Sequence, residues 1–278
     1  PADPFKVYVL AGREEDAGFL GLYRSNNGGS SFQERSTSPN IFGYEDNGGD
    51  DGGQSWYDMA LTADPDDADV IYAGGVNVWK SADGGASWNI RSHWYFTGFD
   101  PYTHADIHSL DAVGGRLLCG SDGGLFSSTD GGDTWTDLSN GLQITQLYRL
   151  GCSPTDPSRV IAGAQDNGMN LLDGGDWSHV LGADGMEGAI DPEDPQIIYG
   201  EQQYGGLYRS DDGGQNFFNI AGQIGEQGAW VTPFTIDPED PQILVAGYNN
   251  VWKSFDRGDN WEPLSEFDTD LTIRALAI

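Results

Sequence analysis

The segment HADIH places three residues with reactive side chains at alternate positions, His104, Asp106 and His108. Because side chains alternate between the two faces of a β-strand, a strand through this segment would present two imidazoles and a carboxylate on one side. Such a trio could bind a transition metal, or act as acid and base together with Asp184 or Glu187. The alternative is structural, with the histidines forming hydrogen bonds to neighbouring strands.

Two further carboxylates lie close together in the segment GADGMEGA, Asp184 and Glu187. Glycosidases need two carboxyl groups roughly 5 to 10 Å apart across the sugar that they cleave. Asp184 and Glu187 could provide the paired carboxylates of such a site, with help from an adjacent strand unit. Alternatively, Asp184 belongs to a glycine turn and Glu187 to a polar network, since acidic residues occur throughout this chain.

The loop YEDNGGDDGGQSW, residues 44–56, combines hard oxygen ligands with many glycines. Ca²⁺ prefers carboxylate and amide oxygens, and glycines allow a loop to wrap tightly around an ion. The spacing is not that of an EF-hand loop, and a flexible acidic loop is the alternative. The candidate calcium ligands, and the one candidate cofactor site of the chain, are Asp46, Asn47, Asp50 and Asp51.

A repeated sequence pattern indicates which elements position these residues. The pattern is Ser, any residue, Asp or Asn, two residues with at least one Gly, two more residues and an aromatic. The Asp can accept hydrogen bonds from backbone N–H groups about two residues further on, and the glycines can adopt the positive φ of a tight turn. Each copy therefore predicts a hairpin turn with a structural Asp and an aromatic anchor in the core. The copies are 25–32, 81–88, 128–135, 210–217 and 254–261, with a shortened sixth at 171–177.

A second repeat, consisting of a strand, a proline turn and another strand, lies between these turns at 62–75, 152–164, 190–201 and 236–248. Together the two repeats predict units of four strands, A to D, with the glycine turn between C and D. The N-terminus starts at the second strand of a unit, and residues 271–278 follow the pattern of a first strand, which could complete the N-terminal unit. The predicted fold is all-β: a six-bladed β-propeller of four-stranded antiparallel blades, in a single domain over 1–278.

In such a fold the D-to-A links and the B-to-C links share one end of the sheets, the usual place for a ligand site. Aligning the first strands by their proline turns predicts which side chains they present there, and the B-to-C links add more. The predicted ligand-binding residues are Tyr57, His104, Asp106, His108, Gln146, Gln165, Asp166, Asn167, Glu201, Gln202, Tyr204 and Trp230. Trp56, Trp94 and Tyr95 are predicted near the same end, unless these aromatics belong to the cores of the sheets.

The charge of the chain restricts its partners. Lys and Arg number 13 against 44 Asp and Glu, which gives a formal net charge of −31. Such a field repels phosphate and anionic lipid, so nucleic-acid binding is disfavoured and cations are favoured. No apolar run approaches the ~18 residues of a membrane span, so membrane insertion is not expected.

The repeated turns resemble those of the Asp-box (BNR-like) repeat β-propellers, in phrases such as SADGGASW and STDGGDTW. This broad group includes sialidases, xyloglucanase-type glycoside hydrolases, sortilin-like receptor domains and photosystem assembly factors. The sequence is most similar to propellers of large secreted or surface proteins of bacteria, which implies a secreted or cell-surface location and a monomeric module within a larger chain. The Arg-Ile-Pro signature of sialidases is missing, and xyloglucanase-type active sites lie between two propellers.

The resemblance and the residues together favour a binding module for a polysaccharide or a protein ligand. Exposed aromatic rings at one end of the sheets could stack on sugar rings or hold a protein segment. The alternative is a glycoside hydrolase with Asp184 and Glu187 as its catalytic carboxylates at the same end. A site with two convergent carboxylates favours hydrolysis, and a shallow aromatic surface favours binding.

Overall fold

The computed structural model describes residues 2–95, 98, 101–268 and 270–276. In this part of the chain the fold is all-β, with six antiparallel sheets and one short 3₁₀ turn. Five sheets have four strands and the first has three, and the strands of every sheet follow one another in sequence order. This confirms the predicted fold class, because a sequential meander of this kind is the blade of a six-bladed β-propeller. The chain divides into two compact units, residues 1–143 and 144–278.

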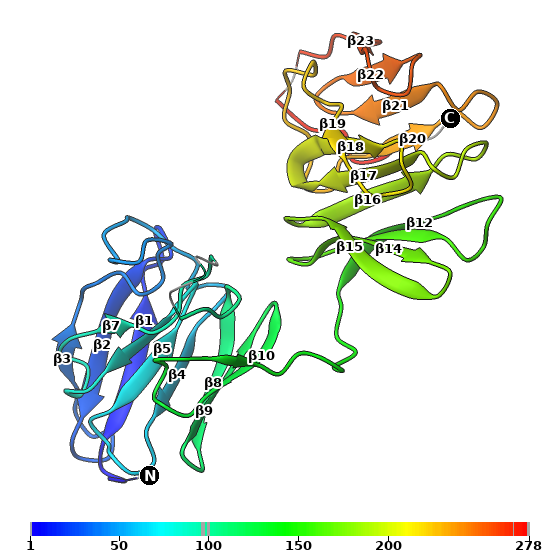
Figure 1. The fold of residues 1–278 in the computed structure, drawn as a ribbon. Coiled ribbons are helices and arrows are strands. Elements are labelled where there is room, and N and C mark those ends of the chain that lie inside the picture. The colour runs from blue at the N-terminus through cyan, green and yellow to red at the C-terminus, as the bar shows by residue number, and fades with distance from the viewer. Residues whose placement is uncertain (1, 96–97, 99–100, 269, 277–278) are drawn as a thin grey trace. The chain divides into compact units, whose positions relative to one another are not determined.

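The first unit contains three sheets and the second unit also contains three (Figure 1). In the first unit the strands are β1 (Val7–Gly12), β2 (Phe19–Ser25) and β3 (Gln33–Ser36); β4 (Ala60–Ala63), β5 (Ile71–Gly74), β6 (Val78–Ser81) and β7 (Asn89–Ile90); and β8 (Ile107–Val113), β9 (Arg116–Ser121), β10 (Gly124–Ser128) and β11 (Thr136–Asp137). In the second unit they are β12 (Leu147–Cys152), β13 (Val160–Ala164), β14 (Gly168–Asp173) and β15 (Asp176–Leu181); β16 (Gly185–Ile190), β17 (Ile198–Gln202), β18 (Gly206–Ser210) and β19 (Phe218–Asn219), with η1 (Gln203–Gly205) between β17 and β18; and β20 (Phe234–Ile236), β21 (Leu244–Gly247), β22 (Val251–Ser254) and β23 (Glu262–Pro263).

The first sheet has the three strands that its sequence predicts. Residues 271–276 form no strand, and the backbone N–H of Ile273 donates to the carbonyl of Tyr248 in the last sheet. Residues 277 and 278 lie outside the described part of the chain. Completion of the first sheet by the C-terminal segment, and a single domain over 1–278, therefore stay predictions.

The five complete repeats form one and the same turn, here called the Ser-Asp turn, between the last two strands of their sheets. In the copy at 128–135, Ser128 Oγ donates to Asp130 Oδ1 at 2.7 Å and accepts from the backbone N–H of Gly132 at 2.8 Å. Asp130 Oδ1 also accepts from the N–H of Thr134 at 2.9 Å. The other four turns repeat these bonds, which confirms that their Asp or Asn is structural.

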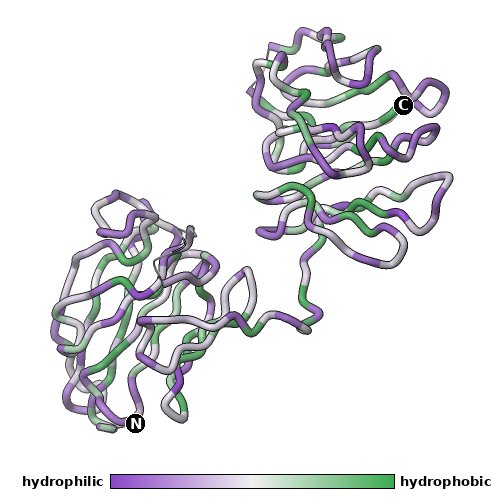
Figure 2. The backbone as a smooth tube through the Cα atoms, in the orientation of Figure 1, coloured by the Kyte–Doolittle hydropathy of each residue, from purple (hydrophilic) through white to green (hydrophobic). Residues whose placement is uncertain are grey.

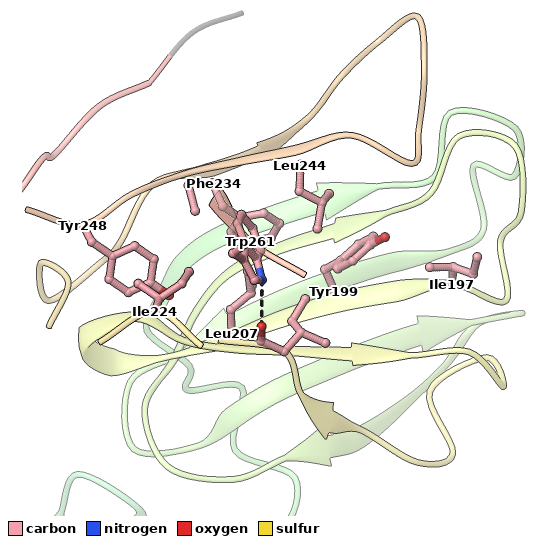
Figure 3. Packing of buried hydrophobic residues seen from close by; sticks show 10 residues of the cluster. Ile197, Tyr199, Leu207, Ile224, Phe234, Leu244, Tyr248 and Trp261 are labelled. Atoms are coloured by element: carbon pink, nitrogen blue, oxygen red, sulfur yellow. Dashed lines mark hydrogen bonds between the residues drawn. The ribbon is translucent and has the colours of Figure 1, made fainter. Parts of the chain in front are cut away.

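The aromatic that ends a Ser-Asp turn ties neighbouring sheets together when it is a tryptophan. The indole N–H of Trp261 donates to the carbonyl of Ile220 at 2.8 Å within a cluster that includes Tyr199 and Phe234 (Figure 3). Trp135 donates in the same way to the carbonyl of Arg91, and Trp88 donates to the side-chain hydroxyl of Ser36. The anchor is missing in the first turn, where Phe32 is exposed.

The shortened repeat at 171–177 forms a simpler structure than the other five. Asp173 and Asp176 pair across Gly174 and Gly175 at the tip of the β14–β15 hairpin, and the Asp173 carboxylate lies 3.3 Å from Arg159. Without the Ser and the full spacing, the backbone-binding turn cannot form. Along the whole chain, hydrophobic residues follow the strands and hydrophilic residues gather in the turns (Figure 2).

Glycines allow two sheets of the second unit to approach backbone to backbone. A Cβ on Gly163 of β13 would lie 2.5 Å from the carbonyl oxygen of Gly185 in β16, and a Cβ on Gly151 of β12 would lie 2.9 Å from the carbonyl carbon of Gly188. Contacts shorter than about 3 Å are not possible for a real Cβ, so the close packing depends on these glycines.

Candidate functional site

Each sheet has two distinct ends. One carries the Ser-Asp turn or, in the β12–β15 sheet, the β14–β15 hairpin tip. The other, here called the linker end, carries the links between successive sheets and the link before the second-last strand of each sheet. As predicted, the candidate ligand-binding residues come from the linker ends: Tyr57 and His104 precede β4 and β8, Asp166 follows β13, and Tyr204 follows β17. The candidates lie in both units.

The trio His104, Asp106 and His108 does not lie on one strand, contrary to the prediction. Strand β8 begins only at Ile107, because Asp106 adopts a φ of 65° in the left-handed region, which breaks the extended backbone. His104 packs against Gly123, whereas His108 is exposed and its Nε2 lies 2.7 Å from Asp122 Oδ1. The three side chains are therefore not presented as one set by an alternating strand.

Asp122 is the residue of this cluster that the sequence reasoning missed. It lies in the β9–β10 link and joins His108 to Tyr57, whose hydroxyl donates to Asp122 Oδ2 at 2.5 Å. The rings of Tyr57 and His108 pack edge to face at 4.9 Å. The available signal was the Asp-Gly-Gly sequence at 122–124, which by its position must be a link between second and third strands.

The side-chain amide of Gln54 binds two carboxylates, those of Asp58 and Asp106. The Gln54 Nε2 donates to Asp58 Oδ2 at 2.9 Å and also to Asp106 Oδ1. Burial, opposed by the Gln54 hydrogen bond and assisted by the charge of Asp106, raises the pKa of Asp58 to about 7. Burial and the charge of Asp122 also raise the pKa of Asp106. The first unit therefore holds a carboxylate network that can bind protons near neutral pH.

The candidate calcium ligands point to different partners. Asp46 Oδ1 lies 3.0 Å from His93 Nδ1, and its other oxygen accepts from Tyr95. Asp50 Oδ2 accepts from the N–H of Tyr44 at 2.6 Å, and Asn47 Oδ1 accepts from the N–H of Gly49 at 2.6 Å. Asp51 is exposed. Binding of Ca²⁺ by this loop and its alternative, a flexible acidic loop, both stay predictions.

The second unit carries an exposed aromatic cluster, which consists of Tyr148, Tyr204 and Trp230. The Trp230 ring lies 5.1 Å from the Tyr204 ring and 6.4 Å from the Tyr148 ring, edge to face in both cases. Trp230 is 39% exposed and Tyr204 is 47% exposed. Backbone bonds from Tyr204 N–H to Trp230 and from Gly228 N–H to Tyr204 hold the two links together. The alternative that Tyr204 and Trp230 belong to the core of their sheets is therefore wrong.

A polar residue of the β13–β14 link contacts this cluster directly. The Tyr148 hydroxyl donates to Gln165 Oε1 at 3.0 Å, and the Gln165 N–H donates to the carbonyl of Gln146. Gln202 Nε2 donates to the carbonyl of Gly182, which fixes the amide within the linker end. Asp166 has a φ of 55°, and Asn167, which follows it in the link, is exposed.

The proposed catalytic carboxylates Asp184 and Glu187 play different parts. Asp184 is half-buried and its Oδ1 accepts from the N–H of Asp166 at 2.9 Å, so it joins the β13–β14 link to the β15–β16 link. Glu187 is half-buried, and its Oε2 lies 3.6 Å from Arg149 Nε. Burial, opposed by the charge of Arg149, raises the pKa of Glu187.

Glu201 lies beneath the surface rather than on it. It is 1% exposed, and its two oxygens accept from the N–H of Thr232 at 2.7 Å and from the N–H of Glu187 at 3.1 Å. Burial raises the pKa of Glu201 to about 8, against these hydrogen bonds. Glu201 was predicted to bind a ligand, but its buried carboxylate positions neighbouring residues. It holds the backbone of Glu187 and of the link that carries Trp230.

The acidic groups predict how the stability of the fold depends on pH. Asp58 and Glu201, with pKa values of about 7 and about 8, bind protons more tightly in the folded state, so the stability that they contribute falls as pH rises from about 4 through 8. At Asp83, hydrogen bonds from Ser87, Ser81 and Ala86 outweigh burial and lower the pKa to about 2, so its contribution is lost as pH falls from about 4 to about 2.

We therefore expect resistance to urea unfolding to be greatest near pH 4 to 5 and to decline on both sides, which circular dichroism across a pH series would measure. The double variant Asp58→Asn with Glu201→Gln should flatten the alkaline side of this profile. An unchanged alkaline slope in that variant would contradict the assignment to these two groups.

Comparison with known proteins adds the following. No protein-family model and no curated protein match the chain. The GH74 xyloglucanase from Xanthomonas campestris is 20% identical, with 93% of this chain and 44% of that chain covered and a TM-score of 0.37. The GH74 enzyme of Niastella koreensis is 14% identical, with 96% and 49% covered and a TM-score of 0.35. The structure of YCF48 bound to D1 peptide is 12% identical, with 95% and 80% covered and a TM-score of 0.33.

The chain spans less than half the length of the two GH74 structures that it resembles. Within the described residues there is no helix with the length and apolar character needed to pass through a membrane.

Proposed function

We propose that the chain is a ligand-binding β-propeller module whose second unit binds a carbohydrate at the aromatic cluster of Tyr148, Tyr204 and Trp230. The observation that carries the proposal is the exposure of Trp230 and Tyr204, whose rings pack edge to face within 5.1 Å of each other at the linker end. The C–H face of a sugar ring is apolar and stacks on such rings, while its hydroxyls need hydrogen-bonding partners. Gln165, which accepts from the Tyr148 hydroxyl, is such a partner at the cluster, and Arg149, paired with Glu187, follows Tyr148 in the chain.

A neutral sugar fits this site better than an anionic one. The net charge of −31 repels carboxylated and sulfated glycans over the whole surface, and Arg149 is already paired with Glu187. The proposed ligand is therefore a neutral oligosaccharide or polysaccharide, which stacks on the rings and is oriented by amide and carboxylate groups.

Replacing Trp230 with alanine is expected to weaken oligosaccharide binding about tenfold or more, because a stacking contact of about 1 to 3 kcal/mol is lost. A glycan array followed by calorimetry with the best neutral oligosaccharide measures this effect. The matched control is Trp177→Ala, since Trp177 is also exposed but lies on β15 beside the hairpin tip, at the opposite end of its sheet. Equal loss in both variants, or binding of anionic glycans alone, would contradict the proposed site.

The raised pKa of Glu187 favours a second candidate function, glycoside hydrolysis, because a general acid must be protonated near the working pH. Time-dependent release of reducing ends from the bound polysaccharide would test this function. If Glu187→Gln abolishes release while binding persists, the chain is a hydrolase. If the wild-type chain binds without release, it is a binding module.

A further inference from the structure

The first unit exposes five large aromatic side chains at its linker end. Trp56 is 79% exposed, and the other members are Tyr44, Tyr57, Trp94 and Tyr95, all from the links that precede β4 and β8. The apolar surface of an aromatic ring is hydrated unfavourably. A group of exposed rings on one end of a small unit therefore indicates a surface that is covered by a partner.

Hydrogen bonds and ring contacts connect these rings with carboxylates into one surface, here called the aromatic-acidic surface. On one side, the Trp94 indole N–H donates to the carbonyl of Tyr44 at 3.0 Å, the Trp94 and Tyr95 rings pack at 5.4 Å, and Tyr95 donates to Asp46. The Tyr44 hydroxyl reaches Gln54 Oε1 at 3.1 Å.

Gln54 joins this side to the other. Its amide nitrogen donates to Asp106, while Tyr57, three residues further along the chain, donates to Asp122 and packs against Trp56 at 5.5 Å. The surface therefore alternates aromatic rings with carboxylates from one side to the other.

Acidic residues outnumber the basic side chains of this surface, which are histidines such as His93, 3.0 Å from Asp46. The segments 43–58 and 92–108 contain no Lys or Arg, and they carry acidic residues that include Glu45, Asp46 and Asp106. Arg13 in the neighbouring β1–β2 link is already paired with Asp16 at 2.8 Å. A ligand that covers the aromatic rings must therefore also neutralise several carboxylates.

We propose that the aromatic-acidic surface binds a basic, arginine-bearing segment of a partner protein. A guanidinium group is planar, stacks on the faces of Trp and Tyr rings, and pairs with carboxylates through its N–H groups. A nucleic acid or an acidic peptide is repelled by the same carboxylates. A neutral sugar could stack on the rings but would leave the charge unbalanced, so charge complementarity selects the basic segment over the carbohydrate proposed for the second unit.

The test uses the full chain and two fluorescein-labelled peptides, one of alternating Arg and Gly and one of alternating Glu and Gly. Fluorescence anisotropy should show saturable binding of the arginine peptide, weakened by salt, and no binding of the glutamate peptide. Trp56→Ala should weaken binding about fivefold to thirtyfold, the loss of one desolvated cation–π contact. Asp46→Asn should also weaken binding and reduce its dependence on salt. Phe32→Ala is the matched control, because Phe32 is exposed in the Ser-Asp turn at the other end of its sheet.

Because Trp56 is largely in water, its removal should leave circular dichroism and carbohydrate binding by the second unit unchanged. The proposal is overturned if the arginine peptide does not bind, or if Trp56→Ala and Phe32→Ala have equal effects. It is also overturned if the surface binds neutral oligosaccharides in a manner that depends on Trp56.

Discussion

Glu201→Ala is expected to destabilise the second unit by about 3 to 4 kcal/mol, because it leaves two buried backbone N–H groups without acceptors. These are the N–H groups of Thr232 and Glu187, which Glu201 binds at 2.7 and 3.1 Å from a fully buried position. Each unpaired donor costs about 1 to 3 kcal/mol, and the lost side chain also leaves a cavity beside Leu207 and Tyr248. Urea unfolding followed by circular dichroism measures the loss.

Glu201→Gln is the matched control for this prediction. Glutamine keeps an acceptor for one of the two N–H groups, so it should be less destabilising than alanine at pH 5. It cannot ionise, so its disadvantage relative to the wild type should shrink as pH rises through about 8, where burial of the wild-type carboxylate becomes costly. Equal destabilisation by Gln and Ala at every pH would show that the hydrogen bonds to Glu201 do not stabilise the fold.

Gly163→Ala is expected to destabilise the second unit by about 3 kcal/mol, at the upper end of overpacking effects. The added Cβ would lie 2.5 Å from the carbonyl oxygen of Gly185, and the atoms it meets belong to the backbone of β16 rather than to a flexible side chain. The two sheets must therefore separate, and β16 also carries Glu187. Binding of oligosaccharide should weaken in the same variant, which calorimetry would detect.

Gly182→Ala provides the comparison, since a Cβ on Gly182 meets no atom within 4 Å and its φ is not positive. We expect its effect on stability to be within about 0.5 kcal/mol of zero. If Gly163→Ala is equally mild, the backbones of β13 and β16 do not pack as closely as described.

The sequence predicted the features that are determined within a few neighbouring residues. A Ser-Asp turn closes with bonds inside one short segment, as Ser128, Asp130 and Thr134 show, so its repetition revealed the number of sheets and their strand order. The exposure of Trp230 and Tyr204 at the linker end followed from the same order.

The sequence did not predict the details of the site, because these depend on backbone conformations that a pattern of alternating residue types does not reveal. His104, Asp106 and His108 alternate in sequence, but the left-handed Asp106 delays β8 to Ile107 and separates the three. Asp122 was missed because its partners, Tyr57 and His108, come from other links, 65 and 14 residues away. Glu201 was placed at the surface because polar residues of links are usually exposed, whereas here two amide groups hold it inside.

The self-contained Ser-Asp turns have a consequence for how this protein can change over evolutionary time. Since each turn satisfies its own backbone groups, the architecture does not depend on the sequences of the links at the opposite ends of the sheets. Those links can be replaced, lengthened or changed in charge one at a time while the sheets persist. The acidic link at 43–58 and the aromatic link around Trp230 show how different two such links can be. The molecule thus combines a repetitive end of its sheets with an irregular end, so that new binding preferences can arise without the loss of the scaffold that displays them.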